Sequence, residues 1–200
     1  MTRIIAGSAR GRRLAVPPGR TTRPTSDRAR EGLFATTLAI CGTLTGAAVA
    51  DLYAGSGAVG LEALSRGADA ALLVESDPRA AQVIRSNIAA AGLPGAQLIT
   101  DRVERALARG AGGLRPRDFV FADPPYATSA AQVQQLLAQL LSGGWLAPSA
   151  LVCVERATRS GAPQWPPGYT ADRCRGYGEA TLWYGLAAGP EPAPGSSAGG

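Results

Sequence analysis

The feature that most constrains the fold is a regular alternation of apolar runs and helix-like segments between residues 47 and 155. The apolar runs are continuous rather than interrupted by polar residues, which is typical of strands covered on both faces. They occupy residues 47–54, 70–75, 96–100, 118–122 and 150–155, and the expected helices occupy residues 58–67, 78–91, 103–109 and 129–141. This alternation predicts an α/β fold with a doubly wound, mostly parallel sheet.

The C-terminal part extends this sheet. Residues 169–186 alternate between apolar and polar side chains, which predicts an antiparallel hairpin at the sheet edge and seven strands in all. The following residues are rich in Pro, Gly, Ser and Ala and show no apolar pattern. We therefore expect the main domain to span residues 25–187 and a disordered tail to span residues 188–200.

The N-terminal part predicts an additional small element. Residues 3–7 and 12–17 have the pattern of two short strands, and we expect an N-terminal hairpin arm at residues 1–24. A helix is expected next, after the cap candidates Thr25, Ser26 and Asp27. Its apolar stripe consists of Ala29, Leu33, Phe34, Leu38 and Cys41.

The arginines are concentrated in this N-terminal part. Residues 1–30 contain eight arginines and one acidic residue, a balance of +7, whereas residues 31–200 carry −2 and the whole chain +5. A basic segment beside a slightly acidic body is the footprint of a polyanion partner such as nucleic acid. A solvated basic tail is the alternative, but the hairpin and helix patterns inside the segment favour a structured arm.

Composition excludes several kinds of site. Histidine is absent from the sequence, which excludes imidazole metal ligands and Ser-His or Cys-His nucleophile pairs. Cys41, Cys153 and Cys174 are odd in number, widely spaced and without a CxxC pattern, so we expect reduced thiols rather than a disulfide framework. No apolar stretch is long enough to cross a bilayer, and the start lacks the apolar core of a secretory signal, so we expect a cytoplasmic protein without membrane contact.

The first expected strand leads into the glycine-rich stretch DLYAGSGAVG at residues 51–60. Gly55, Gly57 and Gly60 match G-x-G-x-x-G, a tight turn that lets a ligand approach the backbone where a helix begins. Glu75 ends the next strand, where a carboxylate can accept hydrogen bonds from ribose hydroxyls. The motif by itself fits nicotinamide, flavin and S-adenosylmethionine (SAM) sites.

Asp51 favours SAM among these ligands. Dinucleotide folds normally carry an apolar residue near this strand end, and a carboxylate there suits the ammonium group of a methionine moiety. Asp101, next to Arg102 after the third strand, stands where the adenine amine needs an acceptor. The alternative for Glu75 and Asp101 is that they only cap the helices that follow.

The fourth strand ends in Asp-Pro-Pro-Tyr at residues 123–126. An exocyclic aromatic amine is a poor nucleophile because its lone pair is delocalised into the ring. Asp123 and the stiffened carbonyl of Pro124 can each accept one N–H of such an amine, which directs the lone pair toward a sulfonium methyl group. Tyr126 offers a flat face for an extruded base, worth about 1–3 kcal/mol. A plain Pro-Pro turn between strand and helix is the alternative.

These stretches together resemble the RsmD family of bacterial 16S rRNA guanine-N2 methyltransferases over nearly the whole chain, the tail excepted. The glycine loop and DPPY are shared by many amino-methyltransferases, whereas the two arginine stretches are particular to this family. The matching stretches are RIIAGSARGRRL (3–14), RPTSDRAREGLF (23–34), DLYAGSGAVGLEALSRGA (51–68), LVESD (73–77), FADPPY (121–126) and GGWL (143–146).

The resemblance implies a Rossmann-like class I SAM-dependent methyltransferase fold, with SAM as methyl donor and no metal. It implies guanine N2 of 16S rRNA as the acceptor, in an assembled or partly assembled 30S subunit, and we expect a monomer. The implied SAM-binding residues are Asp51, Tyr53, Ala54, Gly55, Ser56, Gly57, Glu75, Ser76, Asp101 and Arg102, and the implied catalytic residues are Asp123, Pro124, Pro125 and Tyr126. The implied RNA-binding residues are Arg10, Arg12, Arg13, Arg23, Arg28 and Arg30. An internal pair with Asp27 or Glu31 is the alternative for Arg28 and Arg30.

Four rival functions remain. DNA adenine or cytosine amino-methyltransferases share DPPY, but residues 127–186 leave no room for the separate target-recognition domain that sequence-specific members usually carry. A protein-glutamine methyltransferase more usually has Asn where Asp123 stands. An NAD-dependent oxidoreductase is compatible with the glycine loop and Glu75. A non-catalytic ribosome-assembly factor that keeps the fold for binding alone is the fourth.

Overall fold

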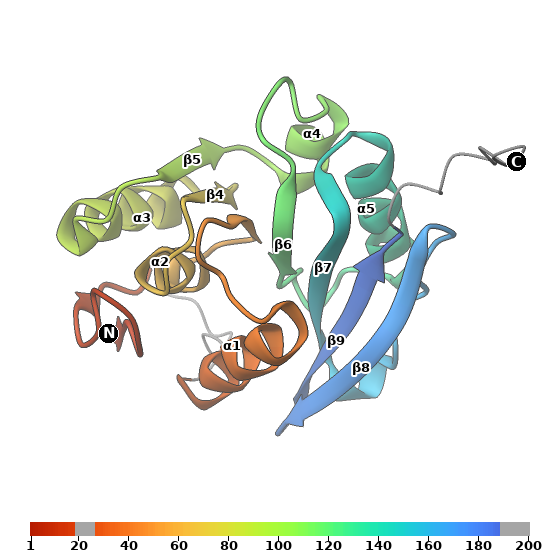
Figure 1. Cartoon of the computed structure of the whole chain (residues 1–200), viewed down its shortest axis with the longest axis horizontal. Coiled ribbons are helices and arrows are strands. Elements are labelled where there is room, and N and C mark those ends of the chain that lie inside the picture. The colour runs from red at the N-terminus through yellow and green to blue at the C-terminus, as the bar shows by residue number, and fades with distance from the viewer. Residues whose placement is uncertain (19–26, 189–200) are drawn as a thin grey trace, which may run out of the picture.

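The computed structural model describes residues 1–18 and 27–188. Its main element is a seven-stranded sheet with the strand order β5-β4-β3-β6-β7-β9-β8 (Figure 1). The strands are β3 (Ala48–Leu52), β4 (Ala70–Glu75), β5 (Ala96–Thr100), β6 (Arg117–Ala122), β7 (Leu146–Ala157), β8 (Tyr169–Tyr177) and β9 (Ala180–Ala187). The first five strands in this order pair in parallel, and β9 is antiparallel to both of its neighbours. The predicted sheet and its C-terminal hairpin are confirmed.

The helices connect these strands. They are α1 (Asp27–Cys41), α2 (Ala58–Ser65), α3 (Pro78–Ala91), α4 (Val103–Ala108) and α5 (Ala130–Ser142), with a 3-10 turn η1 (Thr158–Ser160) after β7. Local sequence signals set their ends. Asp77 caps α3 by accepting from the N–H of Arg79, with Pro78 in the first helical position. Ser129 and Gln132 form a reciprocal capping box at the start of α5.

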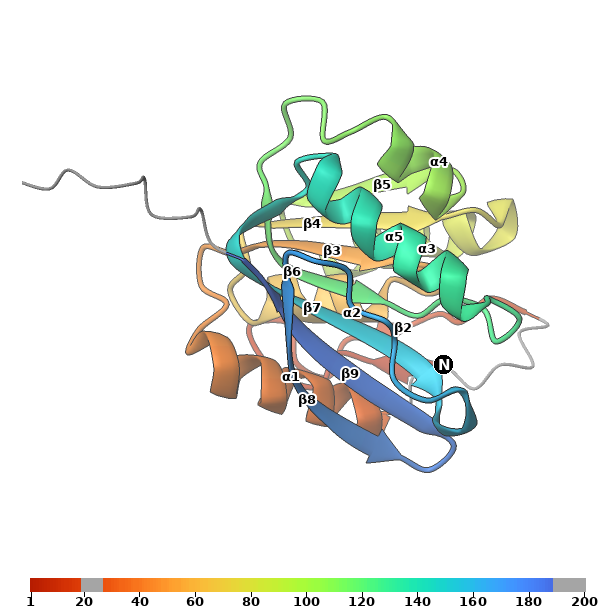
Figure 2. The ribbon, with the colours of Figure 1, turned by 90° about the vertical axis from the view of Figure 1, so that its right-hand side faces the viewer.

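The central strands β3, β4, β6 and β7 are buried on both faces, as the continuous apolar runs predict. Their successive residues alternate between two hydrophobic clusters. One cluster joins side chains such as Val49, Leu73 and Phe119 to α1, α2 and α3. The other lies on the opposite face, against α4 and α5. Figure 2 shows α1 on one side of the sheet and α4 and α5 on the other.

The N-terminal hairpin is shorter than predicted. It consists of β1 (Thr2–Arg3) and β2 (Arg13–Leu14), paired antiparallel, instead of strands at residues 3–7 and 12–17. The reason is that side chains of α2 and α3 take the backbone groups that a longer ladder would use. Glu62 accepts from the N–H groups of Ile5 and Ala6, and Asn87 pairs with the backbone of Ala15.

Other predictions near the ends had mixed outcomes. The stripe on α1 is buried at Ala29, Leu33 and Phe34, but Cys41 is exposed at the last residue of the helix. The three cysteines are free, as predicted. The expected disordered tail lies outside the described residues apart from Ala188, whose N–H donates to the carbonyl of Gly168. In the described ranges, no helix has the length and apolar character needed to cross a membrane.

Candidate active site

The glycine loop and the DPPY corner lie side by side at the carboxyl edge of the sheet. The register aligns Asp51 of β3 with Leu73 of β4 and Phe121 of β6. One residue past the end of β6, the N–H of Asp123 donates to the carbonyl oxygen of Leu52 at 3.3 Å. The two motifs, more than sixty residues apart in sequence, therefore meet at one pair of strand ends. Open α/β sheets bind their ligands at this edge.

The loop between β3 and α2 has a backbone that demands glycine. Gly55 and Gly57 have φ of 59° and 75°, in the left-handed region that glycine tolerates without strain. A Cβ atom on Gly57 would stand 2.7 Å from Cδ2 of Leu73, so the packing against β4 also requires glycine. The result is a tight, buried turn that leads directly into the first turn of α2, the position at which folds of this kind bring a ligand to the main chain.

Two buried carboxylates hold this loop. Asp51 is 2% exposed and accepts from the N–H of Gly60 at 2.9 Å. Glu75 is 4% exposed and accepts from the N–H groups of Gly55 at 2.8 Å and Asp77 at 2.9 Å. The residue that caps α3 is Asp77, so Glu75, the last residue of β4, is not the helix cap. Both acids lie beneath the glycine turn, where the sequence predicts the donor site.

Tyr53 and Asp101 are engaged elsewhere. Tyr53 has a φ of 62°, which turns its ring to the α4 face, where its hydroxyl donates to Glu104 at 2.8 Å. Burial, followed by the hydrogen bond and charge of Glu104, raises the pKa of Tyr53 well above its ordinary value. Asp101 pairs with Arg109 and, at 3.5 Å, with Arg105, both on the α4 side. These ion pairs join Asp101 to α4 without capping it, since the N-cap residue is Arg102 and has no side-chain cap hydrogen bond. The contact of Asp101 with adenine stays a prediction.

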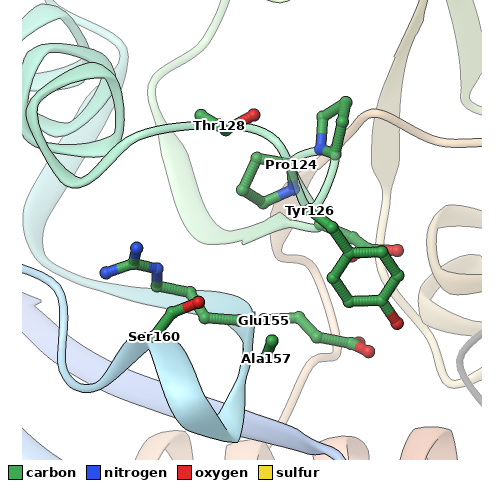
Figure 3. A pocket seen from close by; sticks show the side chains of 9 residues that line it. Pro124, Tyr126, Thr128, Glu155, Ala157 and Ser160 are labelled. Atoms are coloured by element: carbon green, nitrogen blue, oxygen red, sulfur yellow. The ribbon is translucent and has the colours of Figure 1, made fainter.

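The DPPY corner lines a hollow together with the end of β7. Its wall is formed by the corner residues and by Thr128, Glu155, Arg156, Ala157 and Ser160 (Figure 3). Pro124 is buried and Asp123 half-buried, whereas Tyr126 exposes 57% of its surface, a large fraction for an aromatic side chain. Partial burial, followed by the negative charges of Asp123, Glu155 and Glu179, raises the pKa of the Tyr126 hydroxyl. Tyr126 is therefore a neutral ring held at the mouth of an acidic hollow.

Glu155 is a residue that the sequence reasoning missed. It belongs to β7 and is 9% exposed, and its carboxyl end lies near Tyr126 in Figure 3. The signal that could have found it was present. Glu155 ends the apolar run 150–155, as Glu75 ends the run 70–75, and an acid at the carboxyl end of a parallel strand belongs to the ligand edge.

The basic hairpin is anchored on α2. Glu62, fully buried, accepts from the N–H groups of Ile5 and Ala6 at 2.7 and 3.0 Å. The hydroxyl of Ser65 donates to the carbonyl of Ala6 and accepts from the N–H of Ala9. The arm is therefore a fixed part of the molecule within residues 1–18, which supports the prediction of a structured basic segment.

Asn87 of α3 joins the arm to the glycine loop. Its side-chain amide donates to the carbonyls of Ala15 and Ser56 at 2.9 and 2.8 Å and accepts from the N–H of Ala15. The side chain is 2% exposed, so these bonds are shielded from water. One buried amide thus fixes the end of the arm relative to the loop after β3. A lone Asn within a helix carries no sequence signal for this contact.

The expected RNA-binding arginines divide into distinct groups. Arg30 is 1% exposed and pairs with Asp27 at 3.0 Å and with Glu62 at 3.7 Å, so its assignment to RNA binding was wrong and the internal alternative is correct. Burial of a guanidinium requires such partners. Arg12 is exposed, but it also donates to the carbonyls of Ala90 and Ala91 at the end of α3. The other members are Arg10, Arg13 and Arg28, which are exposed, and Arg23, which lies outside the described residues.

Comparison with known proteins places the chain in a family. A family model described as "Conserved hypothetical protein 95" matches residues 2–185. The chain belongs to this family. It is the RsmD family that the motifs resemble, and its member "Ribosomal RNA small subunit methyltransferase D" of Escherichia coli K12 is 37% identical over 171 residues, 86% of this chain and 82% of the relative.

Solved structures agree with this RsmD assignment. The Escherichia coli structure named "Putative methyltransferase yhhF" superimposes with a TM-score of 0.81 and 34% identity, covering 93% of this chain and 97% of that one. A more distant structure, "A putative sam-dependent methyltransferase from Streptococcus mutans", has a TM-score of 0.65 at 15% identity and covers 80% of this chain and 48% of its own. The latter shows the fold alone. This member of the RsmD family therefore has the Rossmann-like fold of SAM-dependent methyltransferases.

Proposed function

We propose that this chain is a SAM-dependent methyltransferase that methylates the exocyclic N2 of a guanine of 16S rRNA, in an assembled or partly assembled small ribosomal subunit. The observation that carries the proposal is the backbone hydrogen bond from Asp123 to Leu52, which joins the DPPY corner to the strand that opens the glycine loop. Family membership and the rRNA methyltransferase name of the Escherichia coli relative support the reaction class and the RNA substrate.

The loop after β3 fits SAM. The left-handed glycines form a tight turn at the start of α2, where such folds bring a ligand to the main chain, and the buried carboxylates of Asp51 and Glu75 lie at the same strand ends. In this proposal Asp51 with Tyr53, Ala54, Gly55, Ser56 and Gly57 binds the methionine end. Glu75 and Ser76 bind the ribose, and Asp101 with Arg102 lies at the adenine edge. SAM, when bound, supplies a methyl group on a positively charged sulfur.

The DPPY corner is the proposed site of the acceptor base. Asp123 and the Pro124 carbonyl each accept one N–H of the guanine amine, which turns its lone pair toward the donor. The N–C bond forms as the C–S bond breaks, and the carboxylate of Asp123 is placed to take the proton that the amine then loses. Pro125 stiffens the corner, and the exposed ring of Tyr126 stacks on the base. No metal is needed for this chemistry.

The exposed arginines of the arm supply the RNA contact. Arg10, Arg12, Arg13 and Arg28 bind phosphates in this proposal, together with Arg23 from outside the described residues. We keep residues 1–24 as the RNA-binding arm, residues 25–187 as the methyltransferase domain and residues 188–200 as a separate tail. The proposed enzyme is a cytoplasmic monomer, because its substrate is ribosomal and one chain contains both sites.

Asp123→Ala tests the proposal. We expect methyl transfer to small subunits to fall by about 10²–10³-fold, because one of the two acceptors of the amine is removed. SAM binding and subunit binding should persist. Asp69→Ala removes an exposed acid at the opposite edge of the sheet and serves as the control. The readouts are transfer of labelled methyl from SAM and mass mapping of the modified nucleotide.

The outcomes separate the rival functions. Full activity of Asp123→Ala refutes the role of this carboxylate. Binding of small subunits by the wild-type protein without transfer indicates a non-catalytic assembly factor. Tight NAD binding with no SAM binding in calorimetry indicates an oxidoreductase, and transfer to DNA instead of 16S rRNA indicates a DNA amino-methyltransferase.

A further inference from the structure

Two carboxylates line one hollow at the DPPY corner, and the proposed transfer uses only one of them. Asp123 follows β6 directly, and Glu155 belongs to the neighbouring strand β7. The register pairs Ala122 with Val154, so the next step along both strands brings Asp123 beside Glu155. By strand alternation both side chains leave the sheet on the face that carries Phe121 and Cys153, which is also the face of Asp51 and Glu75.

The two carboxylates also act on the same ring. Both line the hollow with Tyr126, and the negative charges of both contribute to the raised pKa of the Tyr126 hydroxyl. Figure 3 shows the carboxyl end of Glu155 extended toward Tyr126, across from the prolines. A base stacked on Tyr126 would therefore present one edge to Asp123 and Glu155 together.

Guanine has an edge that matches two adjacent acceptors. Its Watson–Crick edge carries the N1–H donor next to the N2 amine, whereas adenine carries an acceptor at N1. Carboxylates offer acceptors only, and a polar group that meets another acceptor in a desolvated site is strongly unfavourable. A carboxylate beside N1 thus attracts guanine and repels any base that lacks the N1 hydrogen.

We propose that Glu155 accepts the N1–H of the target guanine and is the residue that makes this site select guanine over bases with an acceptor at N1. The proposal rests on the proposed function and deepens it, since it assigns base selection to the end of β7. Asp123 and the Pro124 carbonyl orient the amine, and Glu155 accepts the hydrogen bond from the neighbouring N1 of the ring.

The test uses 2-aminopurine, which keeps the exocyclic amine at position 2 but has an acceptor at N1. Small subunits are reconstituted with 16S rRNA that carries guanine or 2-aminopurine at the mapped target position. Wild-type enzyme should transfer methyl to guanine at least about a hundredfold faster, because a site built to bind an N–H rejects analogues that lack it.

Glu155→Gln should reduce this preference to within about tenfold, since an amide can accept from N1–H or donate to an N1 acceptor. Its rate on guanine should fall about 10- to 100-fold. Glu179→Gln is the matched control, because Glu179 also acts on Tyr126 through its charge but is exposed and not part of the hollow's lining. It should keep the wild-type preference.

An unchanged guanine preference in Glu155→Gln overturns the proposal, as does equal use of both bases by the wild-type enzyme. If Glu155→Gln folds poorly, as shown by weak SAM binding, Glu155→Asp replaces it. The shorter acid should retain the rejection of 2-aminopurine with a lower rate, and loss of that rejection refutes the role of the carboxylate. Absence of any transfer to guanine by the wild-type enzyme refutes the proposed function itself, a result distinct from these.

Discussion

The buried carboxylate of Glu62 is the point at which the arm, α1 and α2 are joined, and its removal gives a quantitative prediction. Glu62 is fully buried and accepts three hydrogen bonds, from the N–H groups of Ile5 and Ala6 and from Nε of Arg66 at 2.9 Å, and it forms an ion pair with Nη2 of Arg66 at 2.9 Å. The buried guanidinium of Arg30 lies 3.7 Å away. Glu62→Gln keeps the shape but removes the charge and turns one acceptor oxygen into a donor.

We expect Glu62→Gln to lower the free energy of unfolding by about 3–5 kcal/mol, the usual effect of removing one partner of a buried ion pair. Since a whole domain is stable by only about 5–15 kcal/mol, this is a large fraction. With a urea slope of about 2 kcal/mol per molar, the unfolding midpoint should fall by about 1.5–2.5 M. Glu31→Gln, at an exposed position of α1, is the control and should change stability by less than about 0.5 kcal/mol.

Urea unfolding monitored by circular dichroism measures the midpoint, and hydrogen exchange locates the effect. The amides of Ile5 and Ala6 should exchange faster in Glu62→Gln, while those of β3 change only with global stability. If the variant is insoluble, Arg66→Met removes one partner of Glu62 and should show the same local pattern at lower amplitude. A destabilisation below about 1 kcal/mol in Glu62→Gln, or unchanged protection at both arm amides, would refute the view that this carboxylate anchors the arm.

Two further predictions concern the arm and the loop. The double variant Arg10→Ala with Arg13→Ala should weaken small-subunit binding. It should also lower the slope of the log binding constant against log salt concentration by about 0.7–0.9 for each phosphate that the arm no longer binds, and an unaltered slope contradicts the arm assignment. Arg30→Ala should instead reduce stability and leave this slope unchanged. Gly57→Ala should raise the SAM dissociation constant at least about tenfold in calorimetry, because its φ of 75° and the 2.7 Å approach to Leu73 act together. Gly178→Ala, with φ of 65° and open space, isolates the backbone strain and should bind SAM normally.

The fold was largely predictable because its signals are local. Continuous apolar runs predict strands that are buried on both faces of a sheet. Pro78 and Gly92 mark the two ends of α3. The failures lie where a long-range side chain competes with the backbone ladder. The strand expected at residues 3–7 ends early because Glu62, nearly sixty residues away, accepts from the N–H groups of Ile5 and Ala6. The local spacing of apolar residues in the sequence cannot predict such a long-range interaction.

The candidate site was likewise predictable where its signals are local and not where they depend on long-range contacts. Asp51, Glu75 and Asp123 were found because each stands at a strand end, and the parallel register brings strand ends together. Arg30 was misassigned because a basic cluster in sequence does not reveal which member is buried. Its i−3 neighbour Asp27 hinted at a pair, but the decisive partner, Glu62, comes from another helix.

The anchoring bonds have a consequence for how the two substrates meet. α2 begins at the glycine loop, and its buried face holds the arm through Glu62 and Ser65, while Asn87 bonds to both the arm and the loop. Short buried bonds of this kind leave the arm little freedom relative to the donor site. If the arm binds RNA as proposed, its phosphate contacts set the distance between the RNA backbone and the hollow, but they carry no information about the base. The proposed function therefore assigns discrimination among bases to the hollow, which Asp123 and Glu155 line.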